Sequence, residues 1–262
     1  MDTTTSTDGT TLAYDRVGRG PALIFVPGVS NLRDTCAPIA AQLADTFTSY
    51  TYDRRARGDS SDTGPYAVER EVEDLQAILE VAGGRATVFG YSSGGVLALR
   101  AAAERLPIDR LFLYEPPFRF DTDDASPADL PDRLQQMMDE GRTADVVSTF
   151  QLEGVGLPPE VVASIRQAPF FPQLQAMAQS VVYDAVITGT LSVPTPAMAA
   201  VRTPTVVMRG GRTWPSLATA ADELVRMLPH AKLHTLADAA DHGLEPISTA
   251  QAIRETTLTE QP

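Results

Sequence analysis

The sequence predicts an α/β fold with a doubly wound, mostly parallel sheet and an inserted helical cap. Three observations lead to this fold class. Short apolar runs alternate with stretches of helical periodicity in the first half of the chain, the alternation stops between residues 117 and 202, and it resumes from residue 203. Alternation of strand and helix implies parallel strands joined by crossover helices. We therefore expect residues 1–116 and 203–262 to form the core and residues 117–202 to form the cap.

The elements of the first half follow from apolar periodicity. The run 22–26 is apolar throughout, which suits a strand covered on both faces of a sheet. In 68–81 the apolar positions repeat every three or four residues, as on one face of a helix. Strands are expected at Thr11–Asp15, Ala22–Val26, Thr46–Tyr52, Ala86–Gly90 and Leu111–Tyr114, and helices at Leu32–Asp45, Val68–Val81 and Gly94–Arg105.

The second half begins with amphipathic helical stretches and no convincing strand run, which is typical of a lid over one end of a sheet. Helices are expected there at Leu130–Glu140, Ala144–Leu152, Glu160–Arg166 and Leu174–Ile187. The α/β pattern then returns, with strands at Thr205–Met208 and Lys232–Leu236 and helices at Ser216–Leu228 and after Pro246.

Composition and charge narrow the classes of function. The 262 residues are 43% hydrophobic and 21% charged, which excludes collagenous, disordered and coiled-coil chains. The net charge of -13 repels phosphate backbones and anionic lipids, so neither nucleic acid nor a membrane is expected as a partner. A single cysteine, Cys36, and three histidines cannot supply a disulfide or a thiolate zinc cage. We therefore expect chemistry without a metal or cofactor.

The sequence carries no visible targeting signal. Its first ten residues contain neither the basic region nor the apolar core of a secretory signal, and no apolar run approaches about 18 residues. A cytoplasmic protein is therefore expected.

The sharpest motif is Gly90-Tyr91-Ser92-Ser93-Gly94, which lies between a predicted strand and a predicted helix, as a nucleophile elbow does. Such a tight turn forces its central residue into strained backbone angles and requires small residues two positions before and after it. Gly90 and Gly94 meet this requirement for Ser92. Centring the turn on the next serine would place a tyrosine at one of these positions. We therefore predict Ser92 as the nucleophile, above the positive end of the following helix.

A nucleophilic serine needs a base, and the chain offers His230, His234 and His242. His230 falls in a predicted turn and His234 within a predicted strand. His242 lies in a loop just beyond the last strand, where a base can overhang the carboxyl edge of the sheet. We therefore predict His242 as the base.

With these motifs the chain resembles the α/β-hydrolase fold superfamily over nearly its whole length. Val26-Pro27-Gly28-Val29 resembles the oxyanion loop of that family, and residues 53–60 resemble its D-x-R-G-x-G-x-S segment. The chain has proline where many members have histidine in the first motif, and alanine and aspartate where they have glycine in the second. The resemblance implies an oxyanion hole made by the backbone N–H groups of Ser93 and Val29.

The acid departs from the family pattern. Members most often carry an aspartate in a G-x-x-D segment after the strand expected at 205–208, but residues 209–215 contain no carboxylate. Glu115 ends the strand that in this fold lies beside the strand of the nucleophile, and Pro116 favours an extended backbone at Glu115. Haloalkane dehalogenases and zearalenone-lactonase-like hydrolases are similar in taking their acid from this position, after the sixth strand. We predict Glu115 as the acid, with Asp241 as the alternative.

The remaining features have simpler interpretations. Asp53, Arg54, Arg57 and Asp59 are expected to form structural ion pairs, and Cys36 to be a small buried residue. Six apolar side chains are candidates for a substrate pocket beneath the cap, although such a stripe is more often core. They are Phe150, Phe170, Phe171, Met177, Tyr183 and Trp214.

Together these features predict a serine hydrolase that cleaves a small-molecule carboxylic ester or lactone through an acyl-enzyme, with Ser92, His242 and Glu115 as the triad. Serine at the elbow argues against dehalogenase and epoxide hydrolase chemistry, because those relatives use an aspartate. Thioesterase, acyl transferase, C–C hydrolase and lyase activities remain alternatives on the same triad. A non-catalytic ligand-binding protein is the alternative from another class.

Overall fold

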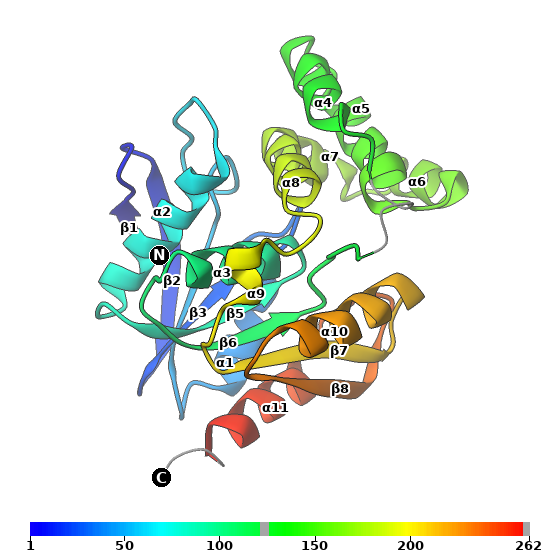
Figure 1. The fold of residues 1–262 in the computed structure, drawn as a ribbon. Helices are drawn as coiled ribbons and strands as arrows, with labels where there is room; N and C mark the ends of the chain where they lie inside the picture. The colour runs from blue at the N-terminus through cyan, green and yellow to red at the C-terminus, as the bar shows by residue number, and fades with distance from the viewer. Residues whose placement is uncertain (121–125, 259–262) are drawn as a thin grey trace.

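The computed structural model describes residues 1–120 and 126–258, which contain one eight-stranded sheet flanked by helices (Figure 1). The strand order is β1-β2-β4-β3-β5-β6-β7-β8. The first two neighbouring pairs in this order are antiparallel and the others are parallel. The strands are β1 (Asp2–Thr5), β2 (Thr11–Gly18), β3 (Ala22–Val26), β4 (Thr48–Tyr52), β5 (Ala86–Tyr91), β6 (Ile108–Tyr114), β7 (Thr205–Arg212) and β8 (Ala231–Ala240). The predicted fold class, with its mostly parallel sheet, is confirmed.

Helices cover both faces of the sheet, as a doubly wound arrangement requires. One face packs against α2 (Val68–Val81), α3 (Ser93–Ala103) and α10 (Pro215–Met227), and the other against α1 (Ala37–Gln42) and α11 (Pro246–Leu258) (Figure 1). Successive residues of β3 point to opposite faces, so that Ile24 and Phe25 are fully buried in different apolar clusters. Burial on both sides explains why β3 is apolar at every position.

The chain leaves the sheet after β6 and returns at β7, and the described part of this inserted segment contains helices and no strand. These are α4 (Leu130–Asp139), α5 (Thr143–Thr149), a π-helix (Phe150–Val155), α6 (Pro159–Arg166), α7 (Phe171–Ala176), α8 (Ala178–Thr190) and α9 (Pro196–Ala199). The segment has its own apolar cluster around Leu134 and Val146, and Val29 and Tyr66 pack against that cluster from the sheet domain. Helices α4, α5 and α6 extend away from the sheet on the side of its carboxyl ends (Figure 1). No helix within the described ranges is both long enough and apolar enough to cross a lipid bilayer.

Several elements differ from the sequence prediction. Strand β1 is an added edge strand whose four residues, one Asp and three Thr, give no apolar alternation to detect. The helix expected at 32–45 is a 3₁₀ turn, Arg33–Cys36, followed by the short α1, which has a proline in its first turn. The helix expected at 174–187 is divided at Met177 into α7 and α8.

Strands β7 and β8 are both longer than expected. They pair with each other from Thr205 opposite Ala231 to Arg212 opposite Ala240, beyond the end of β6. Pairing between distant segments leaves no trace in a short apolar run, so the extension could not be recognised from local pattern. It places residues 209–212, where the family's acid segment was sought, inside a strand.

The central strands should be the most sensitive part of this fold. Leu113 is fully buried in β6, between β5 and β7, whereas Leu233 on the edge strand β8 is 37% exposed. We expect Leu113→Ala to lower the free energy of unfolding by about 2–5 kcal/mol, since it leaves a cavity in a close-packed core. Urea denaturation followed by circular dichroism measures this, and Leu233→Ala as the control should cost clearly less. Equal losses in the two variants would contradict the burial described here.

Candidate active site

Ser92 occupies a strained turn between β5 and α3. Its backbone angles, φ 54° and ψ -125°, are uncommon for a residue with a side chain. Two hydrogen bonds hold the turn: the Ser92 N–H donates to the Tyr114 carbonyl at 2.9 Å, and the Gly95 N–H donates to the Ser92 carbonyl at 2.8 Å. The turn therefore presents the Ser92 side chain at the carboxyl edge of the sheet.

Glycines allow the backbone to crowd around Ser92. A Cβ on Gly94 would overlap the Val26 carbonyl, and a Cβ on Gly90 would lie 2.6 Å from the Gly94 oxygen. A Cβ on Gly28 would lie 2.8 Å from the Cβ of Ser92 itself. The small residues flanking the elbow are thus a steric requirement, and Gly28 lets the preceding loop approach the serine.

The structure brings Ser92, His242 and Glu115 into one chain of hydrogen-bonding distances. His242 Nε2 lies 3.0 Å from Ser92 Oγ, and His242 Nδ1 lies 2.6 Å from Glu115 Oε2. The three residues follow β5, β8 and β6, whose carboxyl ends meet at one edge of the sheet. Glu115 is 1% exposed and Ser92 is 7% exposed, so this series of hydrogen-bonding side chains is largely shielded from water.

Several contacts outside these three residues hold Glu115 and His242 in place. Glu115 Oε1 accepts a hydrogen bond from the Gly210 N–H at 2.7 Å. The paired tyrosines Tyr91 and Tyr114, opposite each other on β5 and β6, donate from their hydroxyls to the carbonyls of His242 and Gly243, each at 2.7 Å. The sequence gives no signal for the role of these tyrosines, because their partners lie about 130 to 150 residues away in the chain.

The backbone of Glu115 is not extended, contrary to the expectation from Pro116. Its φ is 46°, in the left-handed region. The Glu115 N–H donates to the Met208 carbonyl on β7 at 2.9 Å, while its carboxylate binds His242 and the Gly210 N–H. These tertiary contacts outweigh the local preference that a following proline imposes.

The carboxylate on the His242 ring is therefore that of Glu115. The alternative, Asp241, neighbours His242 in the chain, but within the described residues no hydrogen bond joins its side chain to the ring. Asp222, the first carboxylate after β7, is paired with Arg209 at 2.9 Å. Where the family pattern has an aspartate, β7 contributes the backbone N–H of Gly210, which donates to the Glu115 carboxylate.

A cavity of about 510 Å³ opens beside Ser92 and His242. The predicted site residues Val29, Ser93, Phe150 and Trp214 line it, and so do residues for which the sequence predicted no role. These are Pro117, Phe118, Arg119, Glu153, Gly154, Val155, Gly156, Thr188, Ser216 and Leu217. Phe118 and Arg119 follow Glu115 closely in the sequence, and this proximity could have identified them as cavity-lining residues. The π-helix over Phe150–Val155 has no signal in the sequence.

Four of the expected pocket residues do not line this cavity. Phe171 and Tyr183 are buried in the apolar cluster of the inserted helices, and Tyr183 stacks on Tyr66 with ring centroids 3.8 Å apart. Met177 is buried at the junction of α7 and α8, and Phe170 is 48% exposed. Helix packing therefore uses three of these side chains as core, and the prediction that the four line the pocket is corrected.

The proposed oxyanion donors lie at the cavity wall. Val29 and Ser93 both line it, and neither backbone N–H takes part in the turn, loop and capping hydrogen bonds of the described residues.

Cys36 is buried in the apolar cluster beneath α1, and this burial raises the pKa of its thiol to about 12. Residues 1–120 and 126–258 hold no group of three or more His, Cys, Asp or Glu side chains placed to bind a metal ion.

The ion pairs expected around residues 53–59 are present and largely buried. Arg33 pairs with Asp53 and Asp59, Arg54 pairs with Glu71, and Arg57 pairs with Asp184 of helix α8. The sequence suggested Asp53, Arg54, Arg57 and Asp59 as members of this cluster, but not Arg33, nor Glu71 and Asp184, which lie on two separate helices.

Comparison with known proteins relates this chain to a family of hydrolases. The model of the alpha/beta hydrolase family matches residues 23–254. An alpha/beta hydrolase from Sphaerobacter thermophilus, known from its crystal structure, is 44% identical and superposes with a TM-score of 0.91, covering 98% of this chain and 100% of that one.

Two further proteins are more distant. The N-formylmaleamate deformylase of Pseudomonas putida is 36% identical over 119 residues, which is 44% of this chain and 44% of the relative, so the matched part spans less than half of that protein. The structure of an esterase from Thermogutta terrifontis superposes with a TM-score of 0.73 at 22% identity, covering 98% of each chain, which relates the two by fold.

The environment of Glu115 predicts a pH-dependent stability. Burial by itself raises the pKa of this carboxyl, but hydrogen bonds from His242 and from the Gly210 N–H hold it below its ordinary value of 4.5. A group whose pKa is lowered by folding stabilises the folded state fully above its unfolded pKa, and this stabilisation is lost as the pH falls through the folded pKa. We expect the difference in free energy of unfolding between wild type and Glu115→Gln to shrink below a pH of about 4.5.

Urea denaturation at a series of acidic pH values measures this difference. Ser92→Ala keeps the contact between Glu115 and His242, so it should follow the pH dependence of the wild type. A difference between wild type and Glu115→Gln that stays constant through the acid range would show that Glu115 is not held as an ionised carboxylate.

Proposed function

Since the chain belongs to the alpha/beta hydrolase family, we propose that it is a serine hydrolase that cleaves a small carboxylic ester or lactone through an acyl-enzyme intermediate. One observation carries this proposal: the hydrogen-bonded series Ser92, His242 and Glu115 beside the cavity. A serine, an imidazole and a carboxylate in this order form the arrangement that makes a hydroxyl nucleophilic at neutral pH.

In the first half-reaction, Ser92 Oγ attacks the carbonyl carbon while its proton passes to His242 Nε2. The buried Glu115 carboxylate accepts the Nδ1–H of the same ring, at 2.6 Å between Nδ1 and Oε2. It thereby holds the tautomer with a free Nε2 and stabilises the imidazolium that forms. The lowered pKa of Glu115 suits this role, since it favours the ionised carboxylate.

The negative charge of the tetrahedral intermediate develops on the former carbonyl oxygen. The backbone N–H groups of Val29 and Ser93 are the proposed donors to it, and the N-terminus of α3 adds its positive dipole end. When the intermediate collapses, the bond to the alkoxy oxygen breaks and the alcohol leaves with the proton from His242. In a lactone this alcohol stays attached to the acyl group.

The second half-reaction repeats these steps with water. His242 removes a proton from water, the hydroxyl oxygen attacks the acyl carbon, and Ser92 Oγ leaves with the proton from the imidazolium. The products are the carboxylic acid and the free enzyme, so no cofactor is consumed.

We further propose that residues 117–202 act as the cap of this site. The cavity has walls from the core, including Ser92 and Trp214, and from the inserted segment, including Phe150 and Thr188. Its volume of about 510 Å³ is in the range of small-molecule sites. The name of the relative from Pseudomonas putida, a deformylase, supports hydrolysis at an acyl carbon.

Other net reactions use the same residues. A thioesterase, an acyl transferase, a C–C hydrolase or a lyase would need this arrangement with a different substrate or acceptor, and a ligand-binding protein would keep the cavity without turnover. Product analysis after incubation with a panel of esters, lactones and thioesters separates these outcomes. Free carboxylic acid formed from an ester or lactone supports the proposal.

The triad predicts a defined pattern of covalent labelling. We expect a fluorophosphonate to label the wild type once, by intact mass, and not to label Ser92→Ala. His242→Ala and Glu115→Gln should slow labelling by roughly 1000- to 10,000-fold, because the serine loses its activated base.

Asp241→Asn is the matched control, since it changes a carboxylate next to His242 without touching the hydrogen-bonded series. Its labelling rate should stay close to that of the wild type. Slowing in Asp241→Asn with none in Glu115→Gln would transfer the role of the acid to Asp241. A wild type that is never labelled but is stabilised by ligands would overturn the hydrolase proposal in favour of a binding protein.

A further inference from the structure

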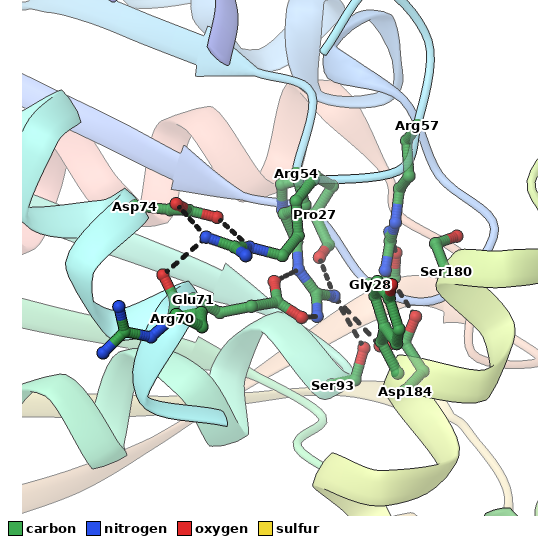
Figure 2. Close-up of polar contacts among 12 residues, drawn as sticks. Pro27, Gly28, Arg54, Arg57, Arg70, Glu71, Asp74, Ser93, Ser180 and Asp184 are labelled. Carbon is green, nitrogen blue, oxygen red and sulfur yellow. Dashed lines mark hydrogen bonds and ion pairs between the residues drawn. The ribbon is translucent and has the colours of Figure 1, made fainter. Parts of the chain in front are cut away.

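A buried cluster of charged side chains lies directly behind the proposed oxyanion loop (Figure 2). Arg54 and Arg57 follow β4 and are only 1% and 2% exposed. Arg54 donates from Nε and Nη2 to both carboxylate oxygens of Glu71 on α2, at 2.6 and 2.7 Å. Its Nη1 donates to Asp184 Oδ1 at 2.9 Å. Guanidinium groups so deeply buried are retained only where their partners are also held in place.

Asp184 joins this cluster to the inserted segment. It lies within α8, is completely buried, and accepts hydrogen bonds from Arg54 on one oxygen and from Arg57 on the other. Two guanidinium groups thus face two carboxylates, those of Glu71 and Asp184, and the charges balance. The side chain of Asp184 points from α8 toward the loop that contains Pro27 and Gly28 (Figure 2).

The same guanidinium groups bind the backbone of the oxyanion loop. Arg57 Nη1 donates to the carbonyl of Gly28 and, at 3.2 Å, to that of Asn31, so it spans the turn that contains Val29. Arg54 Nη1 lies 3.3 Å from the Pro27 carbonyl oxygen and 3.4 Å from Ser93 Oγ.

The contact with Gly28 determines the direction of a specific N–H group. The Gly28 carbonyl and the Val29 N–H belong to one planar trans peptide unit, so they point in opposite directions. A guanidinium bound to the carbonyl therefore sets the direction of the N–H on the other side of the unit. Glycine at 28 places little restriction on rotation of this unit, so the loop depends on such a contact. A charged donor on the carbonyl also polarises the amide and strengthens its N–H as a donor.

We propose that Arg57, held by Asp184 of helix α8, is a positioning residue that aims the Val29 N–H at the oxyanion formed at Ser92. The inference rests on the proposed serine hydrolase function. It adds that packing of α8 against the core contributes to catalysis, because α8 supplies the carboxylate that keeps Arg57 on the Gly28 carbonyl. Neither Arg57 nor Asp184 contacts the substrate in this mechanism.

The chain contains a matched control for this proposal. Arg55 lies between Arg54 and Arg57 in sequence, is 1% exposed, and binds both oxygens of Asp74 at 2.8 Å. Its other partners are Asp8 and the carbonyls of Thr63 and Arg70, all outside the oxyanion loop. Asp74→Asn therefore weakens an equally buried pair without changing the contacts of Gly28.

The test compares Asp184→Asn and Arg57→Lys with Asp74→Asn and wild type. Steady-state kinetics on an activated ester such as a p-nitrophenyl ester give kcat and KM, and inhibition by an aryl boronic acid gives the affinity for a tetrahedral oxyanion mimic.

We expect Asp184→Asn and Arg57→Lys to lower kcat by about 10- to 100-fold with little change in KM, and to weaken boronate binding by a similar factor. The loss should be smaller than on removing a donor outright, because the Gly28 carbonyl also accepts the Asn31 N–H at 3.4 Å. Asp74→Asn should match the wild type in both measurements.

Three outcomes would overturn the positioning role: unchanged boronate affinity in Asp184→Asn, a loss confined to KM, or an equal loss in Asp74→Asn. If Arg57→Lys does not fold, Asp184→Asn alone tests the positioning role, since this substitution preserves side-chain volume and one acceptor oxygen. Failure of the proposed function looks different, because the wild type itself would then neither turn over esters nor react with a fluorophosphonate.

Discussion

The parallel pairing of β5, β6 and β7 is the constraint on which the site depends. Tyr91 is opposite Tyr114 and Tyr114 is opposite Met208, so β5 and β6 end at one level, beside Met208 within β7. Ser92 follows the end of β5 and Glu115 follows the end of β6, and the N–H of each residue donates to the neighbouring strand. The position of the nucleophile relative to the acid is thus set by the sheet and does not depend on a flexible loop.

The three residues of the proposed triad all have a strained backbone. Ser92, Glu115 and His242 all have φ between 46° and 62°, which is unfavourable for residues with a Cβ. Such conformations persist only when surrounding contacts determine them more strongly than local preference does. Here those contacts are the Tyr91 and Tyr114 hydroxyls, the Met208 carbonyl and the Gly210 N–H. The rigid sheet therefore stabilises three unfavourable turns whose side chains converge.

Buried charge connects the inserted helices to this frame. Removing one member of a buried ion pair typically costs about 3–5 kcal/mol, because the remaining charge keeps the cost of its desolvation. Asp184 meets two guanidinium groups from the segment after β4, so α8 has one strongly preferred position on the core. Apolar packing alone, such as Tyr183 stacked on Tyr66, would tolerate small shifts, whereas the geometry of a shared carboxylate does not.

The α/β class, the order of most elements and the elbow at Ser92 could be predicted from the sequence, because apolar periodicity and tight-turn glycines are local properties. His242 and Glu115 could be predicted from their places after predicted strands, with Asp241 left as the alternative acid. The left-handed backbone of Glu115, the burial of Phe171 and Tyr183 in a helical core and the extension of β7 and β8 past β6 emerge only in the folded chain. It alone paired Asp184 with Arg57, residues 127 positions apart. These features arise from contacts between distant segments, and such contacts leave no periodic signal along the chain.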